Sequence, residues 1–310
     1  MRRIQNKVAE SRRTLPVAVL YSVAVWLLAG LVQHQWWIQF ALFVLSTYLM
    51  AQLNNINVLI RIFSRMVSVS FVVLTVSAVF LFPSIKGAFV QMCFIASLLT
   101  FYNSYQDKAS PGWTFYTFLL LGIGSLADIH ILFFVPVFWL MMLIIVYSLC
   151  WRTFFASVVG LLTPYWFWVA WMLWRQNGDL TSVMSHVLSL VNFQIPVPFS
   201  MQQTLLMALV AVLGVTGAIH FIRKSSSDKI RTRQLYYSFF IIGPYAFVLL
   251  LLQPQHYDML IRIMIIAASP LIGHFLALTN TRFTNIVFFI ITIAVSILTV
   301  INLWISSFPS

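Results

Sequence analysis

Residues Trp113 to Tyr147 read WTFYTFLLLGIGSLADIHILFFVPVFWLMMLIIVY, two apolar runs separated by one acid, Asp128, and one histidine, His130. Each run, with its neighbours, is long enough to form part of a membrane-crossing helix. An ionised side chain at hydrocarbon depth costs about 3 kcal/mol or more. We therefore expect the Asp128 and His130 pair where water reaches it, which makes the pair a candidate site.

The composition of the whole chain is that of a protein embedded in lipid. Of its 310 residues, 61% are hydrophobic and only 8% are charged, whereas about a quarter of the residues of a typical soluble domain are charged. Strands of a transmembrane barrel alternate apolar and polar residues over about ten positions, but here unbroken apolar runs of roughly 15 to 20 residues recur. The sequence therefore predicts an all-α fold, a polytopic bundle of transmembrane helices.

Working outward from the central stretch, the apolar runs predict about eleven spans, with the N-terminus inside and the C-terminus outside. The spans cover residues 15–32, 36–53, 67–82, 88–102, 113–147 (two spans dividing near Asp128), 155–174, 204–222, 235–252, 259–278 and 286–305. Residues 1–310 are predicted to form a single integral membrane domain, with residues 1–14 as a basic cytoplasmic N-terminus. Residues 175–203 form an outer loop, in which apolar residues at steps of three and four predict a helix lying in the outer interface.

The net charge of +12 follows this topology. Fifteen of the 18 basic residues fall on the predicted inner side, and only Lys86, Arg175 and Arg262 fall outside. This asymmetry is the one that orients membrane proteins, so we expect the lipid bilayer as a partner and no nucleic acid. The predicted location is the bacterial inner (cytoplasmic) membrane. Cys93 and Cys150 lack partners at disulfide or metal-ligand spacing and are expected to be core residues.

Most of the acidic and histidine side chains on the predicted outer face are candidates for chemistry: Asp128, Asp179, Asp258, His130, His186 and His256. We predict a polar pocket there, in which Asp128 and His130 are catalytic and supply acid or base character. Its substrate-binding residues would be Lys86, Arg175, Asp258 and Arg262, which could hold a phosphate or another anion. Asp258 and Arg262 are four residues apart and can pair on one helix face. The alternative is a set of unrelated interfacial side chains, each solvated or locally paired.

Other kinds of site lack their signals. Asp128 and His130 alone are a weak metal pair, and the chain has no phosphate-binding glycine loop, Ser-His-Asp signature or dinucleotide motif. We therefore expect neither a metal nor another cofactor. The segment GIGS at Gly122 to Ser125 is expected to allow close helix packing. His220 and His274 lie near the inner ends of spans, where a packing role is expected.

Three further stretches carry a resemblance: LNNIN at Leu53 to Asn57, GIGSLADIHILFFVP with the later GLLTPYW, and YDMLIRIMIIAASPLIGHFLAL from Tyr257. Together they resemble a family of bacterial inner-membrane proteins of similar length and unknown function, typical of the Bacteroidota. More loosely, the chain is similar to polysaccharide polymerases and to membrane glycosyltransferases that use polyprenyl-phosphate sugars. That similarity implies an outward-facing site, with Arg262 contacting a lipid phosphate and Asp128 or His130 near the reaction. The chain departs from the glycosyltransferase pattern in its first outer loop, which is very short and carries no acid.

Three functions remain open at this point. The first is an envelope protein that handles lipid-linked sugars or polysaccharide, as a transferase of the glycosyltransferase or polymerase kind, with a polyprenyl-phosphate-linked glycan as its partner. The second is a secondary transporter, which the intramembrane acid and histidine favour. The third is a non-catalytic subunit of an envelope complex, bound to a partner protein, which the scarcity of acids favours.

Overall fold

The computed structural model describes residues 3–175, 181–191 and 198–307. The α-helices in these ranges are α1 (Ile4–Glu10), α2 (Thr14–Leu28), α3 (Trp37–Asn57), α4 (Met66–Ser77), α5 (Ile85–Phe101), α6 (Pro111–Ala127), α7 (Val135–Ile144), α8 (Trp151–Arg175), α9 (Thr181–Leu188), α10 (Met201–Lys224), α11 (Ile230–Leu252), α12 (Tyr257–Leu278) and α13 (Arg282–Ser307). Short 3₁₀ helices are η1 (Val79–Leu81), η2 (Tyr102–Ser104), η3 (Ile129–Phe134), η4 (Ser189–Val191), η5 (Ser225–Ser227) and η6 (Pro254–His256). The described ranges contain no β-strand, so the predicted all-α fold is confirmed.

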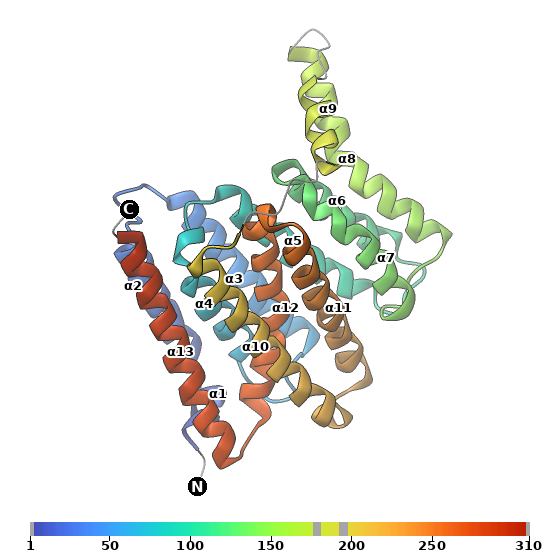
Figure 1. Ribbon diagram of the computed structural model, residues 1–310. Helices are drawn as coiled ribbons and strands as arrows, with labels where there is room; N and C mark the ends of the chain where they lie inside the picture. The colour runs from blue at the N-terminus through green and yellow to red at the C-terminus, as the bar shows by residue number, and fades with distance from the viewer. Residues whose placement is uncertain (1–2, 176–180, 192–197, 308–310) are drawn as a thin grey trace.

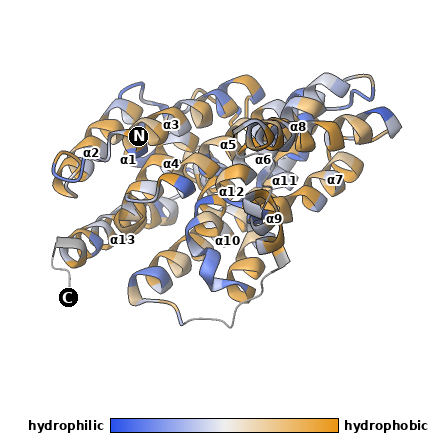
Figure 2. Ribbon diagram, turned by 90° about the horizontal axis from the view of Figure 1, so that it is seen from above, coloured by the Kyte–Doolittle hydropathy of each residue, from blue (hydrophilic) through white to orange (hydrophobic). Residues whose placement is uncertain are grey.

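Helix α12 lies at the centre of the bundle (Figure 1). Its apolar span is entirely buried inside the protein, and it packs against α4, α5, α10 and α11. A helix that is hydrophobic around its whole circumference is stable only where neighbours cover every face. Figure 2 shows the result from above, with α2 and α13 on one side of this core and α6, α7 and α8 on the other.

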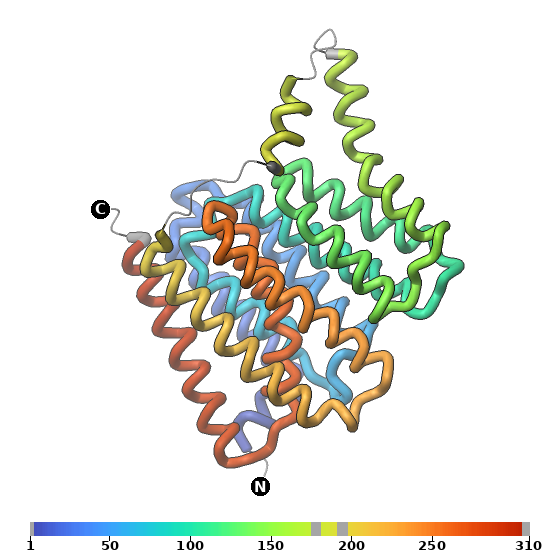
Figure 3. The backbone as a smooth tube through the Cα atoms, turned by 45° about the vertical axis from the view of Figure 1, so that its right-hand side comes forward, coloured from blue at the N-terminus to red at the C-terminus, as the bar shows by residue number. Residues whose placement is uncertain are grey.

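The bundle has two ends, which we name by α12. The upper end holds the first turn of α12 and the lower end holds its last turn, as drawn in Figure 1. The later part of α8, together with α9, extends beyond the upper end (Figure 3). In the predicted topology the upper end is the outer side of the membrane.

Six segments of the described chain are long and apolar enough to cross a membrane: Ile85–Ser104, Trp151–Trp174, Met201–Ser227, Ile230–Leu252, Pro254–Leu278 and Arg282–Ile305. Thr14–Leu28, Met66–Ser77 and Ile129–Ile144 are shorter apolar helices. This set is compatible with an integral membrane protein. Every predicted span overlaps a helix of the structure, but the count of eleven and the orientation of the termini stay predictions.

The outer loop predicted for residues 175–203 contains a helix, α9, as the spacing of its apolar residues indicates. Met184 and Leu188 on this helix are 66% and 61% exposed, so α9 leaves large apolar side chains uncovered by the protein. That exposure suits a helix lying in a membrane interface, although the interface itself stays a prediction. Asp179, one of the candidate side chains on the predicted outer face, lies outside the described residues.

The segment GIGS brings α6 and α8 into direct backbone contact. A Cβ atom added to Gly122 would lie 2.7 Å from the carbonyl oxygen of Leu161, and one added to Gly160 would lie 2.5 Å from that of Phe115. Such separations are far inside van der Waals contact, so only glycine allows the two helices to approach this closely at these positions. The predicted packing role of GIGS agrees with this geometry.

Cys93 is buried, as expected for a core residue, but the same expectation is wrong for Cys150, which is only half-buried because it lies directly before α8, at the end of α7 and α8 remote from Asp128. The accessible Cys150 allows the predicted orientation to be tested. Hydrogen bonds from Thr153 hold the pKa of the Cys150 thiol below its ordinary value. Because the thiolate is the reactive form, we expect a membrane-impermeant maleimide to label Cys150 at a pH below that needed for an ordinary exposed cysteine. Labelling should require opened cells, since Cys150 is predicted to face the cytoplasm.

The matched controls are Cys150→Ser, which leaves only the buried Cys93 and should abolish labelling, and Thr153→Val, which should move half-maximal labelling to higher pH. Rapid labelling of Cys150 in intact cells would reverse the predicted orientation.

Candidate functional site

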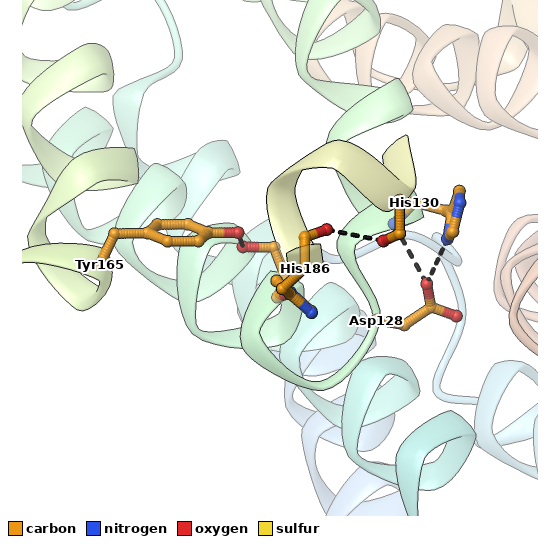
Figure 4. Close-up of polar contacts among 6 residues, drawn as sticks. Asp128, His130, Tyr165 and His186 are labelled. Atoms are coloured by element: carbon orange, nitrogen blue, oxygen red, sulfur yellow. Dashed lines mark hydrogen bonds and ion pairs between the residues drawn. The ribbon is translucent and has the colours of Figure 1, made fainter. Parts of the chain in front are cut away.

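Helix α6 ends at Asp128, and the change of backbone direction there builds the first part of the site. Asp128 is extended, with φ −143° and ψ 109°, and its side chain caps η3 by accepting the backbone N–H of His130. The same carboxylate oxygen, Oδ1, lies 3.1 Å from this backbone nitrogen and 2.8 Å from Nδ1 of the His130 ring. Figure 4 shows both interactions. An acid two residues before a histidine therefore orients the histidine through main chain and ring together.

This arrangement fixes the roles of the two ring nitrogens of His130. A carboxylate accepts hydrogen bonds, so Nδ1 carries the proton that it shares with Asp128, and the neutral ring leaves Nε2 as a base. The side chain of His130 is 11% exposed and that of Asp128 is 25% exposed. Burial acts to raise the pKa of Asp128, but the hydrogen bonds from His130 and the nearby histidines outweigh it and leave the pKa below its ordinary value.

A second histidine, His256, completes what we call the upper triad: Asp128, His130 and His256. His256 is the last residue of η6, directly before α12. Its ring stacks on that of His130, with centroids 3.5 Å apart and planes inclined by 28°. One nitrogen or carboxylate oxygen from each member of the upper triad lies within 4.8 Å of the others. Two imidazolium ions at this distance would repel each other, so the site favours at most one charged ring.

Helices α8 and α9 are held against α6 just before Asp128. Nε2 of His186, on α9, lies 2.8 Å from the carbonyl oxygen of Ser125, and the hydroxyl of Ser125 lies 2.7 Å from that of Tyr165 on α8. These contacts are drawn beside the Asp128 and His130 pair in Figure 4. These polar contacts therefore hold α8 and α9 against the end of α6.

The predicted pair Asp258 and Arg262 forms on α12, where it makes a buried clamp. Nε of Arg262 donates to Asp258 Oδ1 at 2.7 Å, Nη1 to Gln91 Oε1 at 2.9 Å and Nη2 to the carbonyl oxygen of Leu81 at 2.7 Å. The Arg262 side chain is 7% exposed. All three guanidinium nitrogens are thus used inside the protein, which is how a buried arginine offsets the cost of leaving water.

The other carboxylate oxygen of Asp258 accepts a hydrogen bond from the hydroxyl of Ser84, which in turn caps the start of α5. Gly87 makes room for this contact, because a Cβ there would lie 2.0 Å from Asp258 Oδ2. The clamp therefore ties the first turn of α12 to the first turn of α5 and to η1.

The structure brings some of the predicted site residues together and leaves others apart. Asp128 pairs with His130, and Asp258 pairs with Arg262. The two pairs are linked through the chain, because His256, which stacks on His130, is two residues before Asp258. Lys86 is exposed on α5 and makes no ion pair among the described residues. Arg175 ends α8, but its side chain lies outside the described part of the chain. The roles assigned to these six residues stay predictions.

The lower end holds a second polar cluster that sequence analysis missed, the lower relay of Asp228, His274 and His220. Asp228 lies in the basic loop after α10, but its side chain is buried, with 2% exposed. Nε2 of His274 lies 3.0 Å from Asp228 Oδ2, and its Nδ1 lies 3.4 Å from Nδ1 of His220. Arg61 lies 3.8 Å from the same carboxylate. The one signal in the sequence is a lone acid in a basic loop.

The Arg262 clamp can be separated from a ligand-binding role by measuring stability. Arg262→Met leaves the Asp258 carboxylate and Leu81 carbonyl without their partner, so we expect a loss on the order of 3 kcal/mol in the free energy of unfolding in detergent. Asp258→Asn combined with Arg262→Met should recover part of the loss. Lys86→Met, on an exposed side chain, should change stability by less than about 0.5 kcal/mol. Equal stability of Arg262→Met and the unmodified protein would show that the clamp is not structural.

The lower relay makes a different prediction, because its charged partner Arg61 is 42% exposed while Asp228 is buried. Asp228→Ala leaves a buried His274 nitrogen without a partner and should cost about 1–3 kcal/mol of unfolding free energy. Arg61→Ala removes only a solvated ion pair and should cost less than about 1 kcal/mol. Both are measured by thermal or denaturant unfolding in detergent. Similar losses for the two variants would contradict this account of the relay.

Comparison of the chain with protein-family models, with curated proteins and with solved structures finds no match. The resemblances drawn from the sequence therefore stay predictions.

Proposed function

We propose that this integral membrane protein carries out acid–base chemistry at the upper, outward-facing end of the bundle, on the polar group of a lipid-linked sugar. The observation that carries the proposal is the Asp128 and His130 pair. A carboxylate 2.8 Å from one ring nitrogen leaves the other nitrogen free to accept a proton,. The pair is partly exposed at the end of an apolar bundle, where the headgroup of a membrane lipid would lie.

The step we assign to the site is a glycosyl transfer. Nε2 of His130 takes the proton of an acceptor hydroxyl while that oxygen forms a bond to the anomeric carbon of the sugar. The bond from that carbon to the lipid phosphate breaks, and the phosphate leaves with the electron pair. Asp128 stabilises the positive charge that His130 gains, because its carboxylate stays ionised beside the ring.

The surroundings suit a substrate that arrives through the bilayer. Trp166, Phe167 and Trp174 on α8 are 73%, 75% and 81% exposed, so this helix presents large aromatic side chains outside the protein. Aromatic residues favour the interface between lipid and water. Lys86, exposed near the start of α5, is a cation at the same end of the bundle that is free to meet a phosphate.

A secondary transporter is the second candidate, because α12 joins two ionisable clusters at opposite ends of the bundle. Arg262 and His274 are separated by about 18 Å of helix, at 1.5 Å per residue. The residues between them are apolar apart from Ser269, whose hydroxyl donates to the carbonyl oxygen of Ile265 within the same helix. Helix α12 itself thus supplies no polar path between the clusters, so the acid–base site is the stronger proposal.

The test is to delete the gene and follow lipid-linked glycans in membrane extracts by mass spectrometry. We expect the deletion strain to accumulate a lipid-linked sugar. The unmodified protein should clear it, whereas Asp128→Asn and His130→Gln should slow its clearance by roughly 100-fold, the usual contribution of a positioned base. His34→Gln, which changes an exposed histidine remote from the upper triad in sequence, is the matched control and should behave as the unmodified protein. Unchanged extracts in the deletion strain would reject the proposed substrate class.

A further inference from the structure

We propose that Asp128, His130 and His256 bind one divalent transition-metal ion of the Zn²⁺ class, and that this ion supplies the positive charge that meets the substrate's phosphate. The second clause depends on the proposed function, whereas the first does not. The resemblance implies that Arg262 contacts the phosphate, but the guanidinium of that residue is already held by Asp258, Gln91 and Leu81.

The donor set is one that metals of this class use. Two imidazole nitrogens and one carboxylate oxygen form the protein part of many catalytic zinc sites, and the fourth position stays open for water or substrate. The same ligands also suit other first-row divalent ions. Each member of the upper triad offers its donor atom from a partly buried side chain, so the ion would be shielded without being sealed from a ligand.

The distances require little movement. Ligand atoms 2.0 to 2.1 Å from a tetrahedral zinc ion lie about 3.3 Å from each other. The Asp128 and His130 atoms are 2.8 Å apart, and no pair of donor atoms in the upper triad is further apart than 4.8 Å. The widest separation therefore has to close by at most about 1.5 Å. The stacked rings of His130 and His256 also have to turn apart, so that the in-plane lone pair of each reaches the ion, and rotation of the His256 side chain can provide both movements.

The local backbone explains why these three residues meet. Asp128 holds the backbone of His130 through the cap of η3, and His256 is fixed by the short helix η6, whose last N–H donates to the carbonyl oxygen of Gln253. One ligand pair therefore comes from the junction of α6 and η3, and the third ligand comes from the junction of η6 and α12. A metal ion would therefore link the end of α6 to the start of the central helix, α12.

His256 separates the metal site from a simple acid–base pair. Asp128 and His130 already satisfy each other by a hydrogen bond, so a proton-transfer site needs no third member. The side chain of His256 has no hydrogen bond among the described residues, only the ring stack on His130. A metal ion accounts for all three side chains. It would replace the proton on Nδ1 of His130, so the ring proton would lie on Nε2, and a hydroxide at the open position of the ion would take the proton of the acceptor hydroxyl in place of His130.

The experiment uses the full-length protein, purified in detergent and stripped with a chelator, and measures binding of Zn²⁺ by calorimetry and of Co²⁺ by its visible absorption. We expect one ion per chain and a Co²⁺ spectrum of low coordination number. His256→Ala and Asp128→Asn should each weaken binding at least tenfold, whereas His256→Asp, which restores a ligand, should recover part of the affinity. His34→Ala is the matched control and should bind as the unmodified protein does.

Two outcomes would overturn the proposal: no stoichiometric binding, or unchanged affinity in a folded His256→Ala variant. The unfolding temperature with and without Zn²⁺ checks folding, because an ion that binds only the folded chain raises it. Metal binding without any change in lipid-linked glycans would reject the proposed function and keep the metal site. Loss of glycan processing in Asp128→Asn but not in His256→Ala, with no metal bound, would reject the metal site and keep the proposed function.

Discussion

The arginine at position 262 is the constraint on which the upper half of the molecule depends. Its guanidinium lies on the most buried helix of the bundle, where an unpartnered charge would cost several kcal/mol. The guanidinium therefore donates hydrogen bonds to Asp258 on its own helix, to Gln91 on α5 and to a carbonyl oxygen of η1. Once these groups are positioned, the start of α12 is fixed against α5, and with it the segment that carries His256.

The same requirement acts at the lower end. There Asp228 enters the protein interior from a loop, where its carboxylate lies within hydrogen-bond distance of His274 and within ion-pair distance of Arg61. Between the two clusters α12 is apolar and completely enclosed. These two clusters of buried ionisable groups thus lie at the two ends of one helix, and the middle of that helix needs only close packing. This division explains how a chain with 8% charged residues keeps a few of them deeply buried.

The sequence predicts the helices of this fold well, because long apolar runs and the turns between them are local features. It also predicts the pairing of Asp258 with Arg262, since the two residues are four apart on one helix. It marks Asp128 and His130 as a candidate site, but the hydrogen bond between them follows from the backbone turn at the end of α6. It does not predict that His256 stacks on His130, or that Asp228 reaches His274, because these contacts join residues 126 and 46 positions apart. Such contacts depend on how helices are arranged in space, which periodicity along the chain does not encode.

The backbone contact between α6 and α8 limits which natural variants of this chain can keep the upper triad in place. Gly122 and Gly160 set the separation of the two helices, and α6 ends five residues after Gly122, at Ala127, directly before Asp128. A methyl group added at either glycine would push α8 away from α6 and displace the end of α6. Harmful natural variants are therefore expected at positions that touch no ligand at all, since displacement of the end of α6 would by itself misalign His130 against His256.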